Sequence, residues 1–298
     1  MDMSESPSRQ VATSPRRGVI ATDKVFLAYL AINSAVILWH AGEVPGWGWL
    51  LAGNAAGVLL VALLARAPLS RLAIFLGGAY PIILTAAFYT QLGVINLNVG
   101  TLYDGMVQHW ETALFGGEVS VTWHQHLESR ELSFILHGCY VSYYWILMLP
   151  ALFLFFRRSR DAFERGVFIM TLGFYACYVI FSFFPVAGPR YFFGNATGPI
   201  TEVATARLAH WLTEGGSAIG TAFPSSHVAA TWCAVYALWR DARRLAWMVM
   251  PVALGLALGT VYGQFHYAID AVAGAIFGVL LCAAADPLRR ALGSDVRA

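Results

Sequence analysis

Two stretches near the C-terminus, Thr221-Ala-Phe-Pro-Ser-Ser-His227 and Phe265-His-Tyr-Ala-Ile-Asp270, each stand at the start of a long apolar run. The runs cover residues 223–239 and 267–284, close to the length that a helix needs to cross the hydrocarbon of a bilayer. Each motif histidine is therefore expected at the end of a transmembrane helix and not in its middle. This placement predicts a polar site at a membrane surface.

The composition of the chain indicates the same class of protein. Of 298 residues, 58% are hydrophobic and 12% are charged, and the mean hydropathy is +0.61, which is more apolar than a soluble domain requires. The net charge is only +2, and the basic residues stand in short clusters between apolar runs. These features predict a polytopic membrane protein and exclude a basic face that binds nucleic acid.

The apolar runs predict an all-α bundle of about eight transmembrane helices. They cover residues 24–40, 47–65, 72–90, 132–156, 166–184, 223–239, 245–262 and 267–284. No internal repeat separates them, so one transmembrane catalytic domain is expected.

The expected domain boundaries follow from these runs. Residues 24–286 form the predicted transmembrane domain, and its motif-bearing core covers about residues 184–284. Residues 1–23 are polar and aperiodic, which predicts a disordered cytoplasmic tail. Residues 287–298 are expected to form a C-terminal cytoplasmic tail.

The basic residues predict the orientation of the bundle. Sixteen of the nineteen Lys and Arg residues fall on one side of the eight-span arrangement. Because cytoplasmic loops carry the excess of Lys and Arg, both termini are predicted to be cytoplasmic. Arg130, Arg190 and Arg207 remain on the outer side, together with all eight histidines. The chemistry is therefore expected at the periplasmic or extracellular face of a cell membrane, most simply a bacterial inner membrane.

A segment between the third and fourth runs has the pattern of a surface helix. Its apolar residues recur at helical spacing, while its polar residues lie off that stripe: Leu102, Met106, Trp110 and Leu114, against Asp104, Gln108 and Glu111. This predicts an amphipathic helix on the outer surface. Its role is either a belt at the membrane interface or a lid or lateral gate for a lipid substrate.

The segment Pro224-Ser225-Ser226-His227 is expected to open the helix of the sixth span. Pro suits the first turn of a helix, and Ser there caps free backbone N–H groups. These N–H groups and the positive end of the helix dipole together make a seat for a phosphate. His227 would face that seat and donate a proton to a leaving oxygen.

His266 and Asp270 are four residues apart, which places them on one face of the last helix. An Asp that accepts a hydrogen bond from one imidazole nitrogen leaves the other nitrogen free to attack, as in the logic of a catalytic triad. Arg190 adds a planar guanidinium that can hold two phosphate oxygens. A lone histidine at a membrane interface is more often structural, but the ordered set of three motifs favours a phosphoryl-transfer site.

The three motifs, Gly188-Pro-Arg190, Pro-Ser-Ser-His227 and Phe-His-Tyr-Ala-Ile-Asp270, resemble in this order the signatures of the type 2 phosphatidic acid phosphatase superfamily. This superfamily contains membrane lipid phosphatases and phosphotransferases. The upstream Tyr103-Asp104 and Leu114-Phe115-Gly116 resemble the branch that contains inositol-phosphorylceramide synthase. The resemblance implies a six-helix catalytic core with two additional spans at the N-terminus.

The resemblance also implies a role for each motif residue. His266 attacks phosphorus to form a phosphohistidine, Asp270 orients it, and His227 protonates the departing alkoxide. Phosphate oxygens are bound by Arg190, Ser225 and Ser226 with their backbone amides. The family works without a metal ion or another cofactor.

Two positions depart from the family's pattern. A second Arg is usual six residues before the nucleophilic His, where this chain has Thr260, and Ser226 stands where Gly is common. The phosphate site is therefore less positively charged than in a typical phosphatase. Either another outer cation (Arg130, Arg207 or a protonated His) replaces the missing Arg, or the substrate is a phosphodiester with a single negative charge. The second alternative favours head-group transfer between lipids.

Three functions remain open on the sequence alone. The first is an enzyme that transfers a phospho-head group from a membrane lipid to a lipid alcohol. The second is a phosphatase that releases inorganic phosphate from a lipid phosphate. The third is a transporter or a non-catalytic protein that binds lipid phosphates, since polar residues within the membrane also serve transport pathways.

The remaining histidines and cysteines carry weaker signals. All four cysteines fall in apolar runs and are expected to be small core residues. The pair His124 and His126 lacks a neighbouring Cys or matched carboxylate, which disfavours a metal site. His137 and the tyrosines of the same run are expected either to form hydrogen bonds in the core or to line a head-group pocket.

Overall fold

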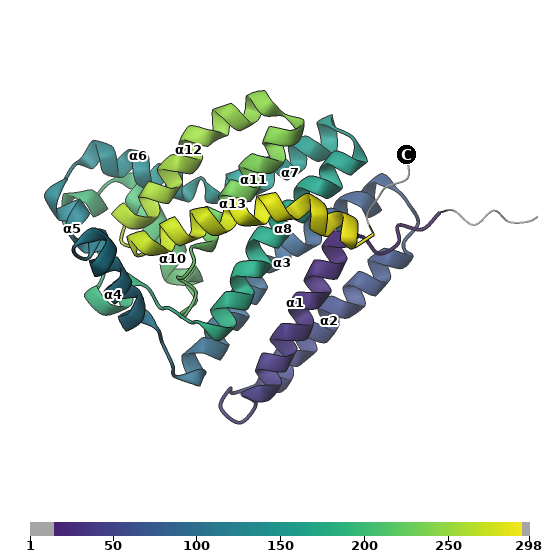
Figure 1. Cartoon of the computed structure of the whole chain (residues 1–298), viewed down its shortest axis with the longest axis horizontal. Helices are drawn as coiled ribbons and strands as arrows, with labels where there is room; N and C mark the ends of the chain where they lie inside the picture. Colours follow the sequence, from purple (N-terminus) through teal and green to yellow (C-terminus); the bar gives the residue numbers. More distant parts are fainter. Residues whose placement is uncertain (1–14, 294–298) are drawn as a thin grey trace, which may run out of the picture.

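The computed structural model describes residues 15–293, and within that range it contains thirteen α-helices, one short 3-10 turn and no β-strand (Figure 1). The helices are α1 (Ala21–Trp39), α2 (Trp47–Arg66), α3 (Arg71–Val99), α4 (Asp104–Phe115), α5 (Val119–His126), α6 (Arg130–Val141), α7 (Tyr143–Arg157), α8 (Arg160–Phe183), α9 (Pro189–Phe193), α10 (Ala204–Gly216), α11 (Ser226–Asp241), α12 (Arg243–Tyr262) and α13 (Ala268–Ala291). The prediction of an all-α bundle is confirmed.

Six of these helices are long and apolar enough to cross a membrane, namely α1, α2, α3, α8, α12 and α13. Helices α6 and α7 pass the same test together, but the chain bends by 44° between them. The protein is therefore a multi-pass membrane protein, with six or seven such helices in the part that the structure describes. The predicted span at residues 223–239 is a helix of only 16 residues, α11, about 24 Å long. A total of eight crossings stays a prediction.

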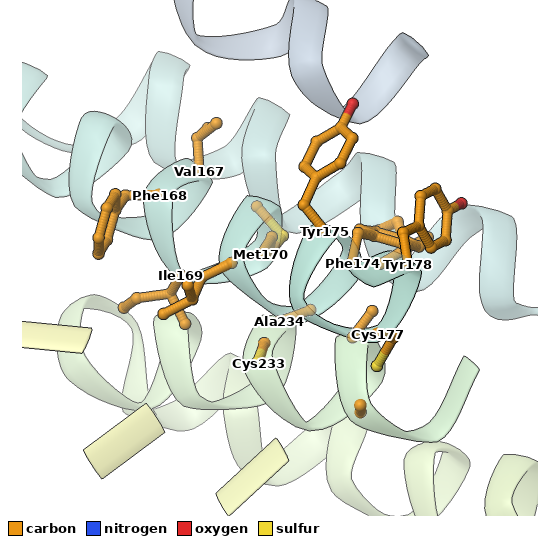
Figure 2. Close-up of a cluster of buried hydrophobic side chains, with 14 of the residues drawn as sticks. Val167, Phe168, Ile169, Met170, Phe174, Tyr175, Cys177, Tyr178, Cys233 and Ala234 are labelled. Atoms are coloured by element: carbon orange, nitrogen blue, oxygen red, sulfur yellow. The ribbon is translucent and has the colours of Figure 1, made fainter. Parts of the chain in front are cut away.

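The core of the bundle lies along α8, whose side chains are buried over most of its length. Helix α11 packs beside it, and Figure 2 shows its Cys233 and Ala234 facing the apolar side chains of α8. Cys177, Cys233 and Cys282 are buried and free, which confirms them as small core residues. Cys139 is half-buried. Because α11 is enclosed by other helices, its apolar surface is buried by protein and not only by lipid.

Serine residues begin several of the long helices. Each accepts a hydrogen bond from the backbone N–H three residues later, which is the usual N-cap arrangement. These caps are Ser70 of α3, Ser129 of α6, Ser159 of α8 and Ser225 of α11. The predicted serine cap of the motif helix is therefore confirmed. Pro224 precedes this cap, so it lies outside the helix and not in its first turn.

The two ends of the bundle differ in the residues and helices that gather there. At one end, Lys24 donates a hydrogen bond to the carbonyl of Leu292, so the start of α1 and the end of α13 are adjacent. Arginine clusters from the loops between α7 and α8 and between α11 and α12 gather at this end as well. The short helices α4, α5, α6 and α10 gather at the opposite end (Figure 1). The membrane face of each end stays a prediction.

The described part of the predicted N-terminal tail is packed and not free. Residues 1–14 lie outside the described residues, but the N–H of Arg17 donates to the carbonyl of Ala67 at 3.0 Å. The guanidinium of Arg17 is buried against Asp23, with an N–O distance of 2.8 Å. The backbone bond holds this segment against the loop between α2 and α3, and the buried ion pair ties it to the start of α1. At the other end α13 continues past residue 286 to Ala291, and residues 294–298 lie outside the described residues.

Candidate active site

A cavity of about 500 Å³ contains four of the six predicted site residues. Arg190, Ser226, His227 and His266 line its polar part together with Ser217. The remaining wall is apolar and comes mainly from α3, α7 and α8, with Phe75, Ile82, Ile83, Leu147, Met148 and Phe174 among its residues. The sequence motifs therefore converge on the polar part of one long apolar pocket.

The predicted nucleophile, His266, lies in the loop that joins α12 to α13. Its Nδ1 is 3.4 Å from Oδ2 of Asp270, a long hydrogen bond, and its Nε2 lies on the opposite side of the ring. Its backbone N–H donates to the carbonyl of Thr260 at 3.0 Å. Burial lowers the pKa of His266 well below its ordinary value, and the nearby His227 and Arg190 lower it further. The imidazole is therefore neutral near pH 7, which is the form that can attack.

His227, in the first turn of α11, lies beside His266, with 5.7 Å between the ring centroids. Its ring also contacts the rings of Tyr143, with centroids 4.3 Å apart, and Tyr140, at 5.5 Å. Its Nδ1 has no hydrogen-bond partner among the described atoms. Two imidazoles thus line one cavity, and the buried Nδ1 of His227 is not satisfied by any described atom.

Arg190 lies in the short helix α9, and its guanidinium donates to the hydroxyl of Ser217. It stacks over the ring of Tyr191 at 5.4 Å and forms no ion pair with a carboxylate of the described residues. The two motif serines occupy different positions relative to the cavity. Ser226 lines the cavity, whereas the hydroxyl of Ser225 is buried as the cap of α11 and does not line it.

Main-chain hydrogen bonds join the three motif segments into one unit. The N–H of Ala222 donates to the carbonyl of Val186 at 2.8 Å, and the N–H of Ser225 donates to the carbonyl of Asp270 at 3.0 Å. Gly188 has φ +100°, and a Cβ there would lie 3.3 Å from the Cβ of Ala222. The first motif therefore requires a glycine at this position, both for its backbone conformation and for its close approach to the second motif.

Neither of the two arginines considered as a replacement for the missing Arg lines the cavity, whereas the motif histidines His227 and His266 do. Thr260, at the position of that Arg, is buried, and its hydroxyl donates to the carbonyl of Ala257 at 2.7 Å. Arg130 forms a surface ion pair with Glu202, and Arg207 is exposed on α10. Among the residues that the structure describes, Arg190 is the one Arg or Lys side chain in the cavity wall.

The outer histidines outside the motifs occupy other positions. His124 and His126 each place Nδ1 against a carbonyl of their own helix, at 3.1 Å and 2.7 Å. His137 is buried, with its Nδ1 3.0 Å from the carbonyl of Ser133, whereas the tyrosines Tyr140, Tyr143 and Tyr144 line the cavity. Within residues 15–293 no group of three His, Cys, Asp or Glu side chains is arranged to hold a metal ion.

Helix α4 carries residues that the sequence pattern did not assign to the site. The predicted helix is present, but its apolar stripe, including Met106 and Leu114, is exposed. Its polar face is turned inward, and Asp104 and Glu111 are 1% and 0% exposed. Burial raises the pKa of both carboxyls, and hydrogen bonds from backbone N–H groups oppose this shift. The spacing of residues 104, 108 and 111 along one helix face was the available signal.

Comparison with known proteins agrees with the motif geometry. A sequence model of the PAP2 superfamily matches residues 106–284, a range that contains all three motif segments and more than half of the chain. No curated protein and no solved structure gave a match. The superfamily's phosphatase-type, lipid-related activity fits a polar site at the head of an apolar cavity. The chain belongs to the PAP2 superfamily and is a multi-pass membrane enzyme of the phosphatase type.

Proposed function

We propose that the protein transfers a phospho-head group from one membrane lipid to another, through a phosphohistidine at His266. The observation that carries this proposal is the charge of the cavity, where Arg190 is the one Arg or Lys side chain of the described residues. A single guanidinium matches the single negative charge of a phosphodiester. The doubly charged phosphate of a monoester would favour a second permanent cation, and the described cavity wall holds no second Arg or Lys.

The apolar part of the cavity supports a lipid as the substrate. Its wall follows α3 from Phe75 to Thr90, a rise of about 22 Å at 1.5 Å per residue. Ile83 of α3 and Met148 of α7 line it and are 67% and 53% exposed. In a bundle set in a bilayer, such exposed faces meet hydrocarbon. A lipid can therefore enter sideways between α3 and α7 while its phosphate reaches Arg190.

The proposed chemistry has two half-reactions. In the first, Nε2 of His266 attacks phosphorus of the donor lipid and the bond from phosphorus to the lipid oxygen breaks. Arg190 and the free N–H groups at the start of α11 hold the phosphate oxygens, and His227 donates a proton to the departing lipid alcohol. In the second, the hydroxyl of an acceptor lipid attacks the same phosphorus, His227 accepts its proton, and the phosphorus–nitrogen bond breaks.

The finer assignment rests on sequence and topology. Tyr103-Asp104 and Leu114-Phe115-Gly116 support the head-group transferase branch that contains inositol-phosphorylceramide synthase. The polar part of the cavity lies away from the arginine clusters, which supports a site on the periplasmic or extracellular face of an inner membrane, with both termini cytoplasmic. The partners are then a phospholipid donor, a lipid alcohol acceptor and the bilayer, without a metal or other cofactor.

The test is a mass-spectrometric assay of the purified protein in EDTA, with mixed phospholipid vesicles that contain ceramide and diacylglycerol. We expect a new lipid that carries the transferred head group. His266→Ala should lower its formation by at least about a thousandfold. The matched control His126→Ala removes an exposed histidine outside the cavity and should leave the rate unchanged.

Other outcomes of this assay identify the alternatives. Release of free phosphate without a new lipid would establish the phosphatase and contradict the transferase. Absence of turnover in the wild-type protein, with lipid binding intact, would favour a non-catalytic lipid-phosphate binding protein or a transporter.

A further inference from the structure

We propose that Asp104 and Glu111 of α4 are positioning residues for the two halves of the site. Asp104 sets the segment that carries Arg190, and Glu111 sets the start of α13 beside His266. This inference rests on the proposed roles of Arg190 and His266. It assigns to α4 a function that is neither the belt nor the lid predicted from its amphipathic pattern.

The carboxylate of Asp104 holds the backbone just before Arg190. Its Oδ2 accepts a hydrogen bond from the N–H of Ala187 and its Oδ1 from the N–H of Gly188, each at 2.8 Å. Two bonds from adjacent N–H groups to one charged group fix both the position and the direction of that backbone. Since Arg190 follows two residues later, Asp104 determines where its guanidinium enters the cavity.

The carboxylate of Glu111 holds the first turn of α13. Its Oε1 accepts from the N–H of Ala268 at 3.1 Å and its Oε2 from the N–H of Ile269 at 2.8 Å. The first N–H groups of a helix have no partner within that helix, and a negative charge there is favoured by the helix dipole. Glu111 thus caps α13 from another helix and fixes the point at which the chain leaves His266.

Tyr267 connects the two anchors. Its hydroxyl donates to Oδ1 of Asp104 at 3.2 Å and accepts from Nε2 of Gln108 at 2.9 Å. Asp104, Gln108 and Glu111 lie on one face of α4, so a single rigid helix contacts both motif segments. A change in the tilt of α4 would therefore move Arg190 and His266 relative to each other.

The orientation of α4 argues against a purely structural role. Burying two carboxylates costs free energy that hydrogen bonds only partly return. The apolar stripe of the same helix, including Leu114, is exposed instead of facing the protein. Contact of this stripe with lipid explains its exposure, but it does not explain why two carboxylates are buried on the opposite face. Placing the polar face inward is explained by the backbone groups that it holds.

Hydrogen exchange of the full-length protein, measured by mass spectrometry in nanodiscs, tests the positioning without reference to activity. We expect Asp104→Asn to increase the exchange rate at residues 186–190 by at least about fivefold and to leave residues 267–270 unchanged. Glu111→Gln should do the reverse. The control Glu131→Gln changes an exposed carboxylate on α6 and should change neither segment.

The amides of α8 show in the same experiment whether each variant is folded, and they should keep the wild-type rate. Exchange that rises equally in both segments, or in neither, would overturn the proposal. This holds even if the wild-type protein proves to transfer no head group, so failure of the proposed function and failure of the positioning are separate results.

Kinetics give a second readout that a loss of folded protein would not imitate. With the mixed vesicles of the transfer assay, Asp104→Asn should raise KM for phospholipid about tenfold with kcat within about threefold of wild type. Glu111→Gln should lower kcat about tenfold and leave KM within about threefold. If both variants lose kcat alone, in proportion to a fall in the amount of folded protein, the two carboxylates are structural and the proposal is wrong.

Discussion

The two ends of the bundle neutralise their carboxylates in different ways. At the end where α1 begins, arginines do so: Asp161 pairs with Arg165 and Arg289 at 2.6 and 2.8 Å, and Asp241 pairs with Arg165 at 2.7 Å. At the cavity end Arg130 and Glu202 form a surface pair, but the partners of the buried Asp104 and Glu111 are backbone N–H groups and a tyrosine hydroxyl.

This difference distinguishes arginines whose charge is balanced by a carboxylate of the fold from Arg190, whose charge is not. An arginine that pairs with a buried carboxylate has its positive charge balanced within the protein. Backbone N–H groups and a tyrosine hydroxyl hold Asp104 and Glu111, so these carboxylates need no arginine. Arg190 forms no ion pair with a described carboxylate. Its charge remains available to a phosphate.

The largest expected effect concerns this arginine. Arg190→Gln should lower kcat/KM for head-group transfer by at least about a hundredfold, because charge-assisted hydrogen bonds to the phosphate are lost. The matched change at the other end, Arg165→Gln, should lower the melting temperature and leave kcat/KM within about threefold. Initial rates at several lipid fractions measure both. Similar losses of kcat/KM in the two variants would remove the distinction between the ends.

A smaller effect is expected from Gly188→Ala, which should lower kcat/KM about tenfold. The alanine must adopt a left-handed φ of +100°, and its new Cβ crowds Ala222 and the carbonyl of Phe265. The control Gly194→Ala has φ +79° but no neighbour within 4 Å of the new Cβ. It should cost about 1–3 kcal/mol of stability through backbone strain and leave the rate within about twofold. Equal rates in the two variants would show that the close approach at Gly188 is not needed.

The pH dependence of the rate should be modest near neutrality. Since the pKa of His266 is lowered by burial, the neutral form persists as the pH falls below its ordinary value of about 6.5. The acid limb of the profile of kcat/KM against pH should therefore have an apparent pKa below about 6.5. An acid limb centred above about 7 would contradict a lowered pKa at His266.

The smallest effect is expected from Asp161→Asn at the arginine-rich end. Asp161 is partly exposed and pairs with two arginines, so its removal should cost about 1 kcal/mol of unfolding free energy or less. The transfer rate should be unchanged. Thermal unfolding in detergent, with a rate measured on the same sample, checks both. A fall in rate at unchanged stability would show that this end also serves the reaction.

The site residues that were predictable from sequence have local signatures. His266 and Asp270 are separated by one helical turn, and both stand at the edge of an apolar run where a polar group is costly. Asp104 and Glu111 were not predictable as site residues, because their partners are backbone N–H groups 83 to 158 positions away. Backbone groups leave no side-chain pattern in a sequence.

The fold class was predictable and is confirmed, whereas the number of about eight spans stays a prediction. A run of apolar residues shows that a helix is shielded from water, and burial by protein satisfies that condition as well as burial by lipid. Helix α11 is enclosed by α8, α12 and α13. The length of its apolar run therefore does not show whether the helix crosses the membrane. The bend at Ser142 likewise lies inside the apolar run 132–156 and leaves no mark in its hydropathy.

The proposed sideways entry of a lipid between α3 and α7 makes the fraction of substrate among the surrounding lipids the variable that sets the rate. A substrate that enters from the hydrocarbon is presented as a fraction of the surrounding lipids, and its amount per volume of water is irrelevant. The reaction should thus obey two-dimensional kinetics, in which adding inert lipid slows turnover at constant substrate. A detergent tail in the apolar part of the cavity would compete with the lipid, so turnover should also fall as detergent is added at constant substrate.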